Sequence, residues 1–155
     1  MRFTRVRDLL GLALTVALVS WLVIRQLYGD LPPFPAFVPL SLAVLAVVEV
    51  VLGSQLRSRI ARRPGTTPVQ PLVAARAVAL AKASSLVGAA AAGFWAGLLL
   101  HVIPNINFLT VAGADARTGV IGLLCAMALA AAGLWLEHSC RTPDRPEDDA
   151  PARPA

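Results

Sequence analysis

Four stretches of apolar residues, each long enough to cross a lipid bilayer, constrain this chain more than any other feature. They run from about residue 9 to 27, 37 to 56, 72 to 103 and 119 to 136. A helix needs about 20 mostly apolar residues to cross a hydrocarbon core of about 30 Å. Hydrophobic residues make up 57% of the 155-residue chain, and this surplus has to face lipid. The pattern predicts an all-α integral membrane protein, a four-helix bundle within residues 1–136.

Prolines and polar residues separate the four stretches. Residues 31–36 contain three prolines, which deny a helix its backbone donors. Pro64 is expected to end the second helix, and Pro71 suits the first turn of the third. The segment from residue 105 to 118 is predicted to be a polar connection. Residues 137–155 are too poor in apolar side chains to fold and are predicted to form a disordered tail.

The basic residues indicate how the helices are oriented. Of the 14 Lys and Arg residues, all except Arg25 and Arg117 fall on one side of the expected four-helix arrangement. Because cytoplasmic segments are enriched in Lys and Arg, both termini and the middle connection are expected in the cytoplasm. The first stretch is not followed by a small-x-small cleavage site, so it is predicted to be an uncleaved helix rather than a signal peptide. The expected location is the cytoplasmic membrane.

Several functional classes are disfavoured by the sequence. The net charge of +5 comes from residues that flank apolar stretches without interleaved aromatic residues, so no nucleic-acid partner is expected. Cys125 and Cys140 lie on one helical run, more than about 20 Å apart, which is too far for a disulfide. They have no metal-ligand spacing to His101 or His138. The chain also lacks catalytic and cofactor motifs, so no catalytic residue, cofactor, metal or enzymatic activity is predicted.

Small residues recur at every fourth position of the third stretch. The first row is Ser85, Ala89, Gly93 and Gly97, and the second is Ser84, Gly88, Ala92 and Ala96. Rows of this kind let membrane helices approach one another closely. The fourth stretch carries a matching row at Gly122, Ala126 and Ala130. The third and fourth helices are therefore predicted to pack together inside one chain, with a homodimer face as the alternative.

Glu49 is the one acidic residue embedded in an apolar run. A carboxylate inside a membrane helix costs about 3 kcal/mol or more, so it needs a partner or a proton. Lys82 enters the membrane from the same expected side and is the predicted ion-pair partner, with Arg76 as a weaker candidate. A structural brace is favoured over a proton- or ion-handling residue, because transport sites collect several polar groups near the midplane.

A cluster of arginines follows the second stretch. Its members are Arg57, Arg59, Arg62 and Arg63. The cluster is suited to fixing the topology and to contacting anionic lipid head groups, at about 1 kcal/mol per basic residue. The lipid bilayer and its anionic head groups are therefore the partners that the sequence predicts most directly.

Particular segments resemble a known family. They are residues 1–10 (MRFTRVRDLL), 28–33 (YGDLPP), 62–66 (RRPGT), 71–84 (PLVAARAVALAKAS) and 93–97 (GFWAG). Together they resemble the actinobacterial membrane-protein family called domain of unknown function 3180, over roughly residues 2–142. The resemblance implies an actinobacterial inner-membrane protein. It implies no activity and no catalytic residue.

Two functions are consistent with these features. The first is a non-enzymatic membrane protein that scaffolds or assists a membrane-protein partner, because the expected helices have short loops and no assembled polar site. The alternative is a small transporter, or a subunit of one, that uses Glu49 and Lys82.

Overall fold

The computed structural model describes residues 6–27, 37–60, 71–106 and 112–139, which form four long helices. They are α1 (Val6–Leu27), α2 (Phe37–Ile60), α3 (Pro71–Val102) with the short 3-10 helix η2 (Ile103–Asn105), and α4 (Ala112–Ser139). Each of the four long helices is long and apolar enough to cross a membrane. The predicted all-α membrane fold with four helices is thereby confirmed.

The boundaries of α3 follow from its prolines and one side-chain cap. Pro71 is the first residue of the helix, where the missing N–H would have no intrahelical acceptor in any case. Pro104 lies in η2, directly after the helix. The Asn105 side chain donates a hydrogen bond of 2.8 Å to the His101 carbonyl, one of the last carbonyls of the helix. Both ends of α3 therefore have a local chemical cause.

The largest difference from the sequence-based boundaries concerns α4. Residues 112–118, predicted to be a polar connection, form its first turns. Asp115 lies in the first turn, where a negative charge interacts favourably with the helix dipole. At its other end α4 continues to Ser139, so Glu137 belongs to the helix and not to the tail. The rest of the predicted tail lies outside the described residues, as do the predicted breaks at residues 31–36 and Pro64.

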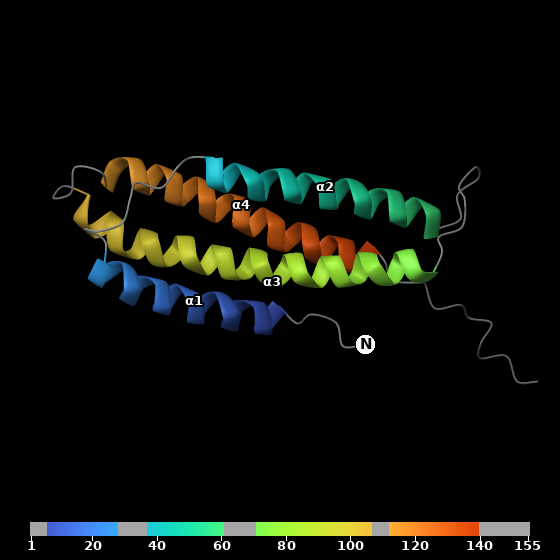
Figure 1. Ribbon diagram of the computed structural model, residues 1–155, viewed down its shortest axis with the longest axis horizontal. Helices are drawn as coiled ribbons and strands as arrows, with labels where there is room; N and C mark the ends of the chain where they lie inside the picture. Colours follow the sequence, from blue (N-terminus) through green and yellow to red (C-terminus); the bar gives the residue numbers. More distant parts are fainter. Residues whose placement is uncertain (1–5, 28–36, 61–70, 107–111, 140–155) are drawn as a thin grey trace, which may run out of the picture.

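The four helices lie side by side in the order α1, α3, α4, α2 (Figure 1). α3 and α4 form the central pair. α1 packs on α3, whereas α2 packs on α4 and touches α3 only at a few points. Within the described ranges α1 contacts neither α2 nor α4. The central α3–α4 pair thus separates α1 from α2, although these two helices follow each other in the chain.

The helices of each outer pair run parallel. α1 and α3 run in one direction and α2 and α4 in the other (Figure 1). The first residues of α1 and α3 therefore share one end of the molecule with the last residues of α2 and α4. We call this the amino-terminal end, and the other the opposite end. α3 and α4 meet antiparallel, as shown by the glycine contacts described next.

α3 and α4 pack together as the sequence predicts, but the first row of small residues on α3 does not face α4 along its whole length. A Cβ on Gly133 of α4 would lie 2.8 Å from the backbone nitrogen of Ser85, so the start of the row does face α4. A Cβ on Gly97 would instead lie 2.5 Å from the carbonyl oxygen of Ala17, on α1. Gly93 faces α1 in the same way.

The reason for this change of partner is the helical repeat. A step of four residues turns an α-helix about 40° beyond one full turn, because it has 3.6 residues per turn. Three such steps separate Ser85 from Gly97, and they rotate the row by about 120° around α3. The second row, by contrast, has Gly88 against α4, where a Cβ would lie 2.5 Å from the Ala130 nitrogen. Small residues on two faces let α3 lie between two helices.

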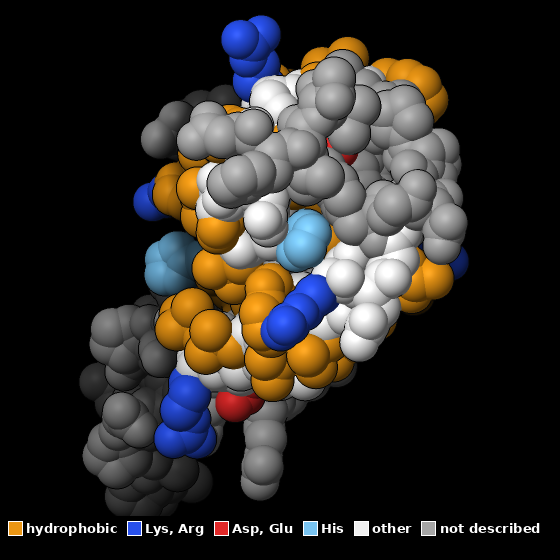
Figure 2. Space-filling view, turned by 90° about the vertical axis from the view of Figure 1, so that its left-hand side faces the viewer, with side chains coloured by type: hydrophobic (Ala, Val, Ile, Leu, Met, Phe, Trp, Pro, Cys, Tyr) orange, Lys and Arg blue, Asp and Glu red, His pale blue; other side chains and the backbone are white. Residues whose placement is uncertain are grey.

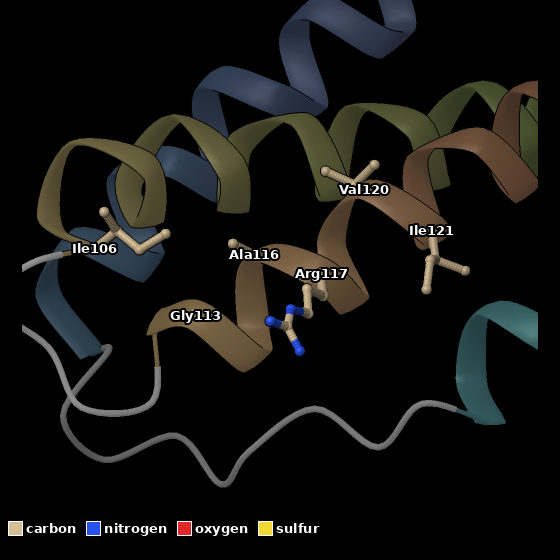
Figure 3. Close-up of a pocket in the computed structure, with 6 residues that line it drawn as sticks. All are labelled: Ile106, Gly113, Ala116, Arg117, Val120 and Ile121. Atoms are coloured by element: carbon tan, nitrogen blue, oxygen red, sulfur yellow. The ribbon is translucent and has the colours of Figure 1, made fainter.

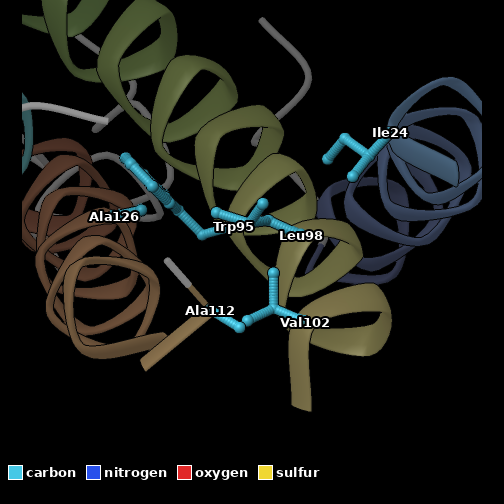
Figure 4. Packing of buried hydrophobic residues seen from close by; sticks show 6 residues of the cluster. All are labelled: Ile24, Trp95, Leu98, Val102, Ala112 and Ala126. Carbon is cyan, nitrogen blue, oxygen red and sulfur yellow. The ribbon is translucent and has the colours of Figure 1, made fainter. Parts of the chain in front are cut away.

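The largest buried hydrophobic cluster joins α1, α3 and α4. Its buried members are Ile24, Trp95, Leu98, Val102, Ala112 and Ala126 (Figure 4). Trp95 is only 2% exposed and meets Phe94 edge-to-face, with 5.4 Å between the ring centres. Gly122 of α4 faces the Trp95 indole, which occupies the space that a side chain there would need. The core of this half of the molecule is therefore mainly apolar, and Asp115 is a buried acidic residue within it.

Candidate functional site

Glu49 lies on the face of α2 that packs against its neighbours. The buried and half-buried residues along this face are Pro39, Leu42, Ala46, Glu49, Gly53 and Leu56. Their alternating spacing of three and four residues is the spacing with which one helix packs along another. Ala46 packs on α4, and a Cβ on Gly53 would lie 3.2 Å from the Trp135 ring. Glu49 thus lies in a line of packing positions, and the other positions of this line are occupied by apolar or small residues.

The Glu49 side chain is completely buried, with an exposed fraction of 0%. Neither carboxyl oxygen has a hydrogen-bond partner among the described residues. Ser84 of α3, itself buried, brings its hydroxyl toward the carboxyl, but it stays outside hydrogen-bond geometry. Nine residues separate Glu49 from Ser58, the end of the membrane-length segment, which is about 14 Å of helix. The carboxyl therefore lies well inside this segment and not at its edge.

Lys82 and Arg76 lie on α3, toward the same end of the molecule. Lys82 is half-buried and Arg76 is exposed. The carbonyl of Lys82 accepts a hydrogen bond of 3.0 Å from the Ser85 hydroxyl. No hydrogen bond from Lys82 reaches Glu49. The ion pair between Glu49 and Lys82 is thus absent as a hydrogen-bonded contact in this structure, and it stays a prediction.

Glu137 is a buried acid that the sequence-based boundaries place in the tail. It is 5% exposed and lies one turn beyond Gly133 of α4. A Cβ on Gly133 would lie 2.8 Å from the Ala81 carbonyl oxygen, so α3 and α4 are close at this level. The signal for its burial was present in the sequence, because Ala126, Gly133 and Glu137 fall on the packing face of one uninterrupted helix.

The amino-terminal end carries part of the predicted arginine cluster. The Arg57 guanidinium lies over the Trp135 ring, 5.6 Å from its centre, and joins α2 to α4. Arg59 is in α2, but its side chain is not described, and Arg62 and Arg63 lie outside the described residues. An arginine stacked on a tryptophan near the end of a membrane helix is suited to the zone of lipid head groups.

The opposite end has a similar pair and a shallow apolar depression. The Arg25 guanidinium lies 5.6 Å from the centre of the Trp21 ring. Viewed from this end, basic and histidine side chains are scattered singly among hydrophobic and uncharged ones (Figure 2). The depression has a volume of about 550 Å³ and is lined by Ile106, Gly113, Ala116, Arg117, Val120 and Ile121 (Figure 3). One cation on an otherwise apolar lining does not make a polar substrate site.

The described residues contain no group of three or more His, Cys, Asp or Glu side chains that could hold a metal ion. His101 lies near the opposite end of α3, whereas His138 lies near the amino-terminal end of α4. Among the polar groups of the described membrane segments, the Glu49 carboxyl and the Ser84 hydroxyl come near each other from α2 and α3. A carboxyl in this setting can bind a proton or accept a hydrogen bond.

Comparison with known proteins adds a family. A family model described as "Protein of unknown function (DUF3180)" matches residues 9–144, which include nearly all of the four long helices. No curated protein and no solved structure matches the chain. Because the match covers most of its length, this chain belongs to the DUF3180 family.

Proposed function

We propose that this chain is a non-enzymatic scaffold or assembly partner of another membrane protein in the cytoplasmic membrane. The observation that carries the proposal is the row of helices. α1 and α2 lie at its two edges, and long apolar side chains cover their outer faces. Leu14 is 71% exposed on α1 and Val47 is 63% exposed on α2. A row offers a much wider lateral surface to lipid or to other membrane helices than a compact bundle of the same helices.

The proposed topology has both termini in the cytoplasm. Arg7, Arg57 and Arg76 belong to the amino-terminal end, whereas Arg25 and Arg117 belong to the opposite end. This distribution supports a cytoplasmic amino-terminal end by the positive-inside rule. Arg57 and the arginines that follow it would then face the anionic lipids of the inner leaflet.

Affinity capture of the tagged full-length chain from native membranes, in mild detergent, tests the scaffold proposal. We expect a stoichiometric membrane-protein partner. Leu14→Trp places a bulky side chain on the outer face of α1, and Val47→Trp does the same on α2. Only the variant on the helix that binds the partner should lose the partner, and the variant on the other helix is then the matched control. Capture of the chain alone, or with a partner that both variants retain fully, would contradict docking at these edges.

A small transporter, or a subunit of one, is the second candidate. The observation that favours it is the completely buried carboxyl of Glu49, since ionisable groups inside membrane helices commonly mark ion or proton pathways. Lys82 would be the second residue of such a pathway. The test is proton flux into vesicles that contain the purified chain, driven by a potassium diffusion potential. A proton flux that exceeds that of empty vesicles, and that the Glu49→Gln substitution abolishes, would favour the transporter over the scaffold.

A further inference from the structure

The position of Glu49 in the helix packing requires an explanation beyond scaffolding. Ala46 comes one turn before it and Gly53 one turn after it, and both are buried against α4. A leucine or alanine at position 49 would fill the seam without the cost of removing a carboxyl from water. The burial of a polar group without a hydrogen bond is unfavourable, and the burial of a charge costs more. The chain thus places its most costly side chain where packing needs an apolar one.

The ionised form of Glu49 is poorly supported by its surroundings. Toward the amino-terminal end, the described charged and titratable side chains of these helices are Lys82 and Arg76 of α3, Glu137 and His138 of α4, and Arg57 of α2 itself. Arg76, His138 and Arg57 are exposed, and Arg57 is stacked on an indole. None of the five donates a hydrogen bond to either oxygen of Glu49. A buried carboxylate without a hydrogen-bond donor is costly in a medium of low dielectric constant.

The neutral acid fits the same place better. A protonated carboxyl is uncharged and has an O–H donor, whereas the ionised group is an acceptor only. Ser84 offers the hydroxyl oxygen that such a donor needs, and it lies on the α3 side of the niche.

We propose that Glu49 is a membrane-buried proton-binding site, whose proton is bound while α2 is packed against α3 and α4. Ionisation then requires α2 to move away from Ser84, so that water or lipid head groups reach the carboxyl. The proposal does not depend on the scaffold function or on transport. It gives Glu49 a ligand, the proton, and so explains why a carboxyl occupies a position where helix packing alone would favour an apolar residue.

The site links stability to pH with a definite sign. The folded protein holds the proton, whereas an exposed glutamic acid loses it above about pH 4 to 5. The unfolded state therefore binds fewer protons than the folded state at neutral pH, and stability falls as the pH rises. The Glu49 contribution lowers the ratio of folded to unfolded protein tenfold per pH unit, until the folded protein also releases the proton.

Unfolding of the full-length protein in detergent between pH 6 and pH 8.5 measures this linkage. Glu49→Gln imitates the neutral acid and cannot ionise, so it should remove the pH dependence that Glu49 contributes. Glu137→Gln is the matched control at a second buried acid, and it should leave that contribution in place. If Glu49 is instead ionised and ion-paired, the difference in unfolding free energy between wild type and Glu49→Gln should be constant over this pH range. That result would overturn the proposal.

Infrared spectroscopy of the folded protein at pH 7 gives an independent readout. The proposal requires the carbonyl band of a protonated carboxylic acid, present in wild type and in Glu137→Gln and absent from Glu49→Gln. Should Glu49→Gln fail to fold, Ser84→Ala replaces it, because loss of the hydroxyl should shift the same band. A carboxylate band in place of the acid band, or an acid band that neither variant alters, would refute the assignment.

Discussion

Replacing Gly97 by alanine should loosen α1 from α3. A Cβ at this position would lie 2.5 Å from the Ala17 carbonyl oxygen and 2.9 Å from the Ser20 Cβ, both on α1. Neither atom lies at the far end of a flexible side chain, so no rotamer change relieves the overlap. Ordinary contacts of a Cβ begin near 3.4 Å, and the difference from 2.5 Å requires α1 to retreat by about 0.9 Å.

The size of the effect follows from this displacement. A gap of about 0.5–1 Å removes a quarter to a half of the dispersion energy of each contact that it opens. Insertion of one methyl group into a well-packed interior typically costs about 1–3 kcal/mol. We therefore expect Gly97→Ala to lower the free energy of unfolding by about 2 kcal/mol, because membrane helices associate mainly through such packing.

Reversible unfolding in mixed micelles with increasing sodium dodecyl sulfate measures this free energy. Gly11→Ala is the matched control, since it makes the same chemical change on α1, where a Cβ would meet nothing within 4 Å. The control should be neutral or slightly stabilising, because alanine favours a helix over glycine by about 1 kcal/mol. Equal stability of the two variants would show that Gly97 does not face α1.

Three further outcomes are expected. Gly122→Ala should destabilise the protein by about 1–3 kcal/mol, because its methyl group would overlap a buried indole; a silent substitution would contradict the α3–α4 register. Glu49→Gln and Lys82→Met should be additive within about 0.5 kcal/mol, because the protonated Glu49 that we propose offers Lys82 no charge to pair with; a coupling above about 1 kcal/mol would support the ion pair predicted from the sequence instead. In a background without native cysteines, an impermeant reagent applied outside should label a cysteine at Ala114 but not at Ser58, and the reverse pattern would invert the proposed topology.

Only part of the surroundings of Glu49 could be predicted from the sequence. Glu49 is conspicuous as a lone acid in an apolar run, and burial of its side chain follows from that position. Its neighbour was not accessible, because the choice between Lys82 and Ser84 depends on how α2 and α3 are rotated about their axes. Charge complementarity predicts Lys82, and that pair stays a prediction, whereas the nearness of the Ser84 hydroxyl to the carboxyl is seen only in the structure. Glu137 was missed because polarity was taken to end the helix before it.

The sequence by itself determined the number, length and membrane character of the helices. These depend on the hydropathy of each stretch alone, since a segment in lipid must satisfy its backbone hydrogen bonds within itself. The start of α3 at Pro71 is likewise determined by the local sequence.

Only the tertiary structure decided which helices are neighbours. In α2, α3 and α4 the apolar residues are spread around the helix and not gathered on one face, and lipid is as apolar as the protein interior, so no polar face reveals where another helix lies. The order α1, α3, α4, α2 and the division of the small residues of α3 between α1 and α4 depend instead on shape. Shape complementarity is a property of two surfaces together, and the sequence of one helix does not contain it.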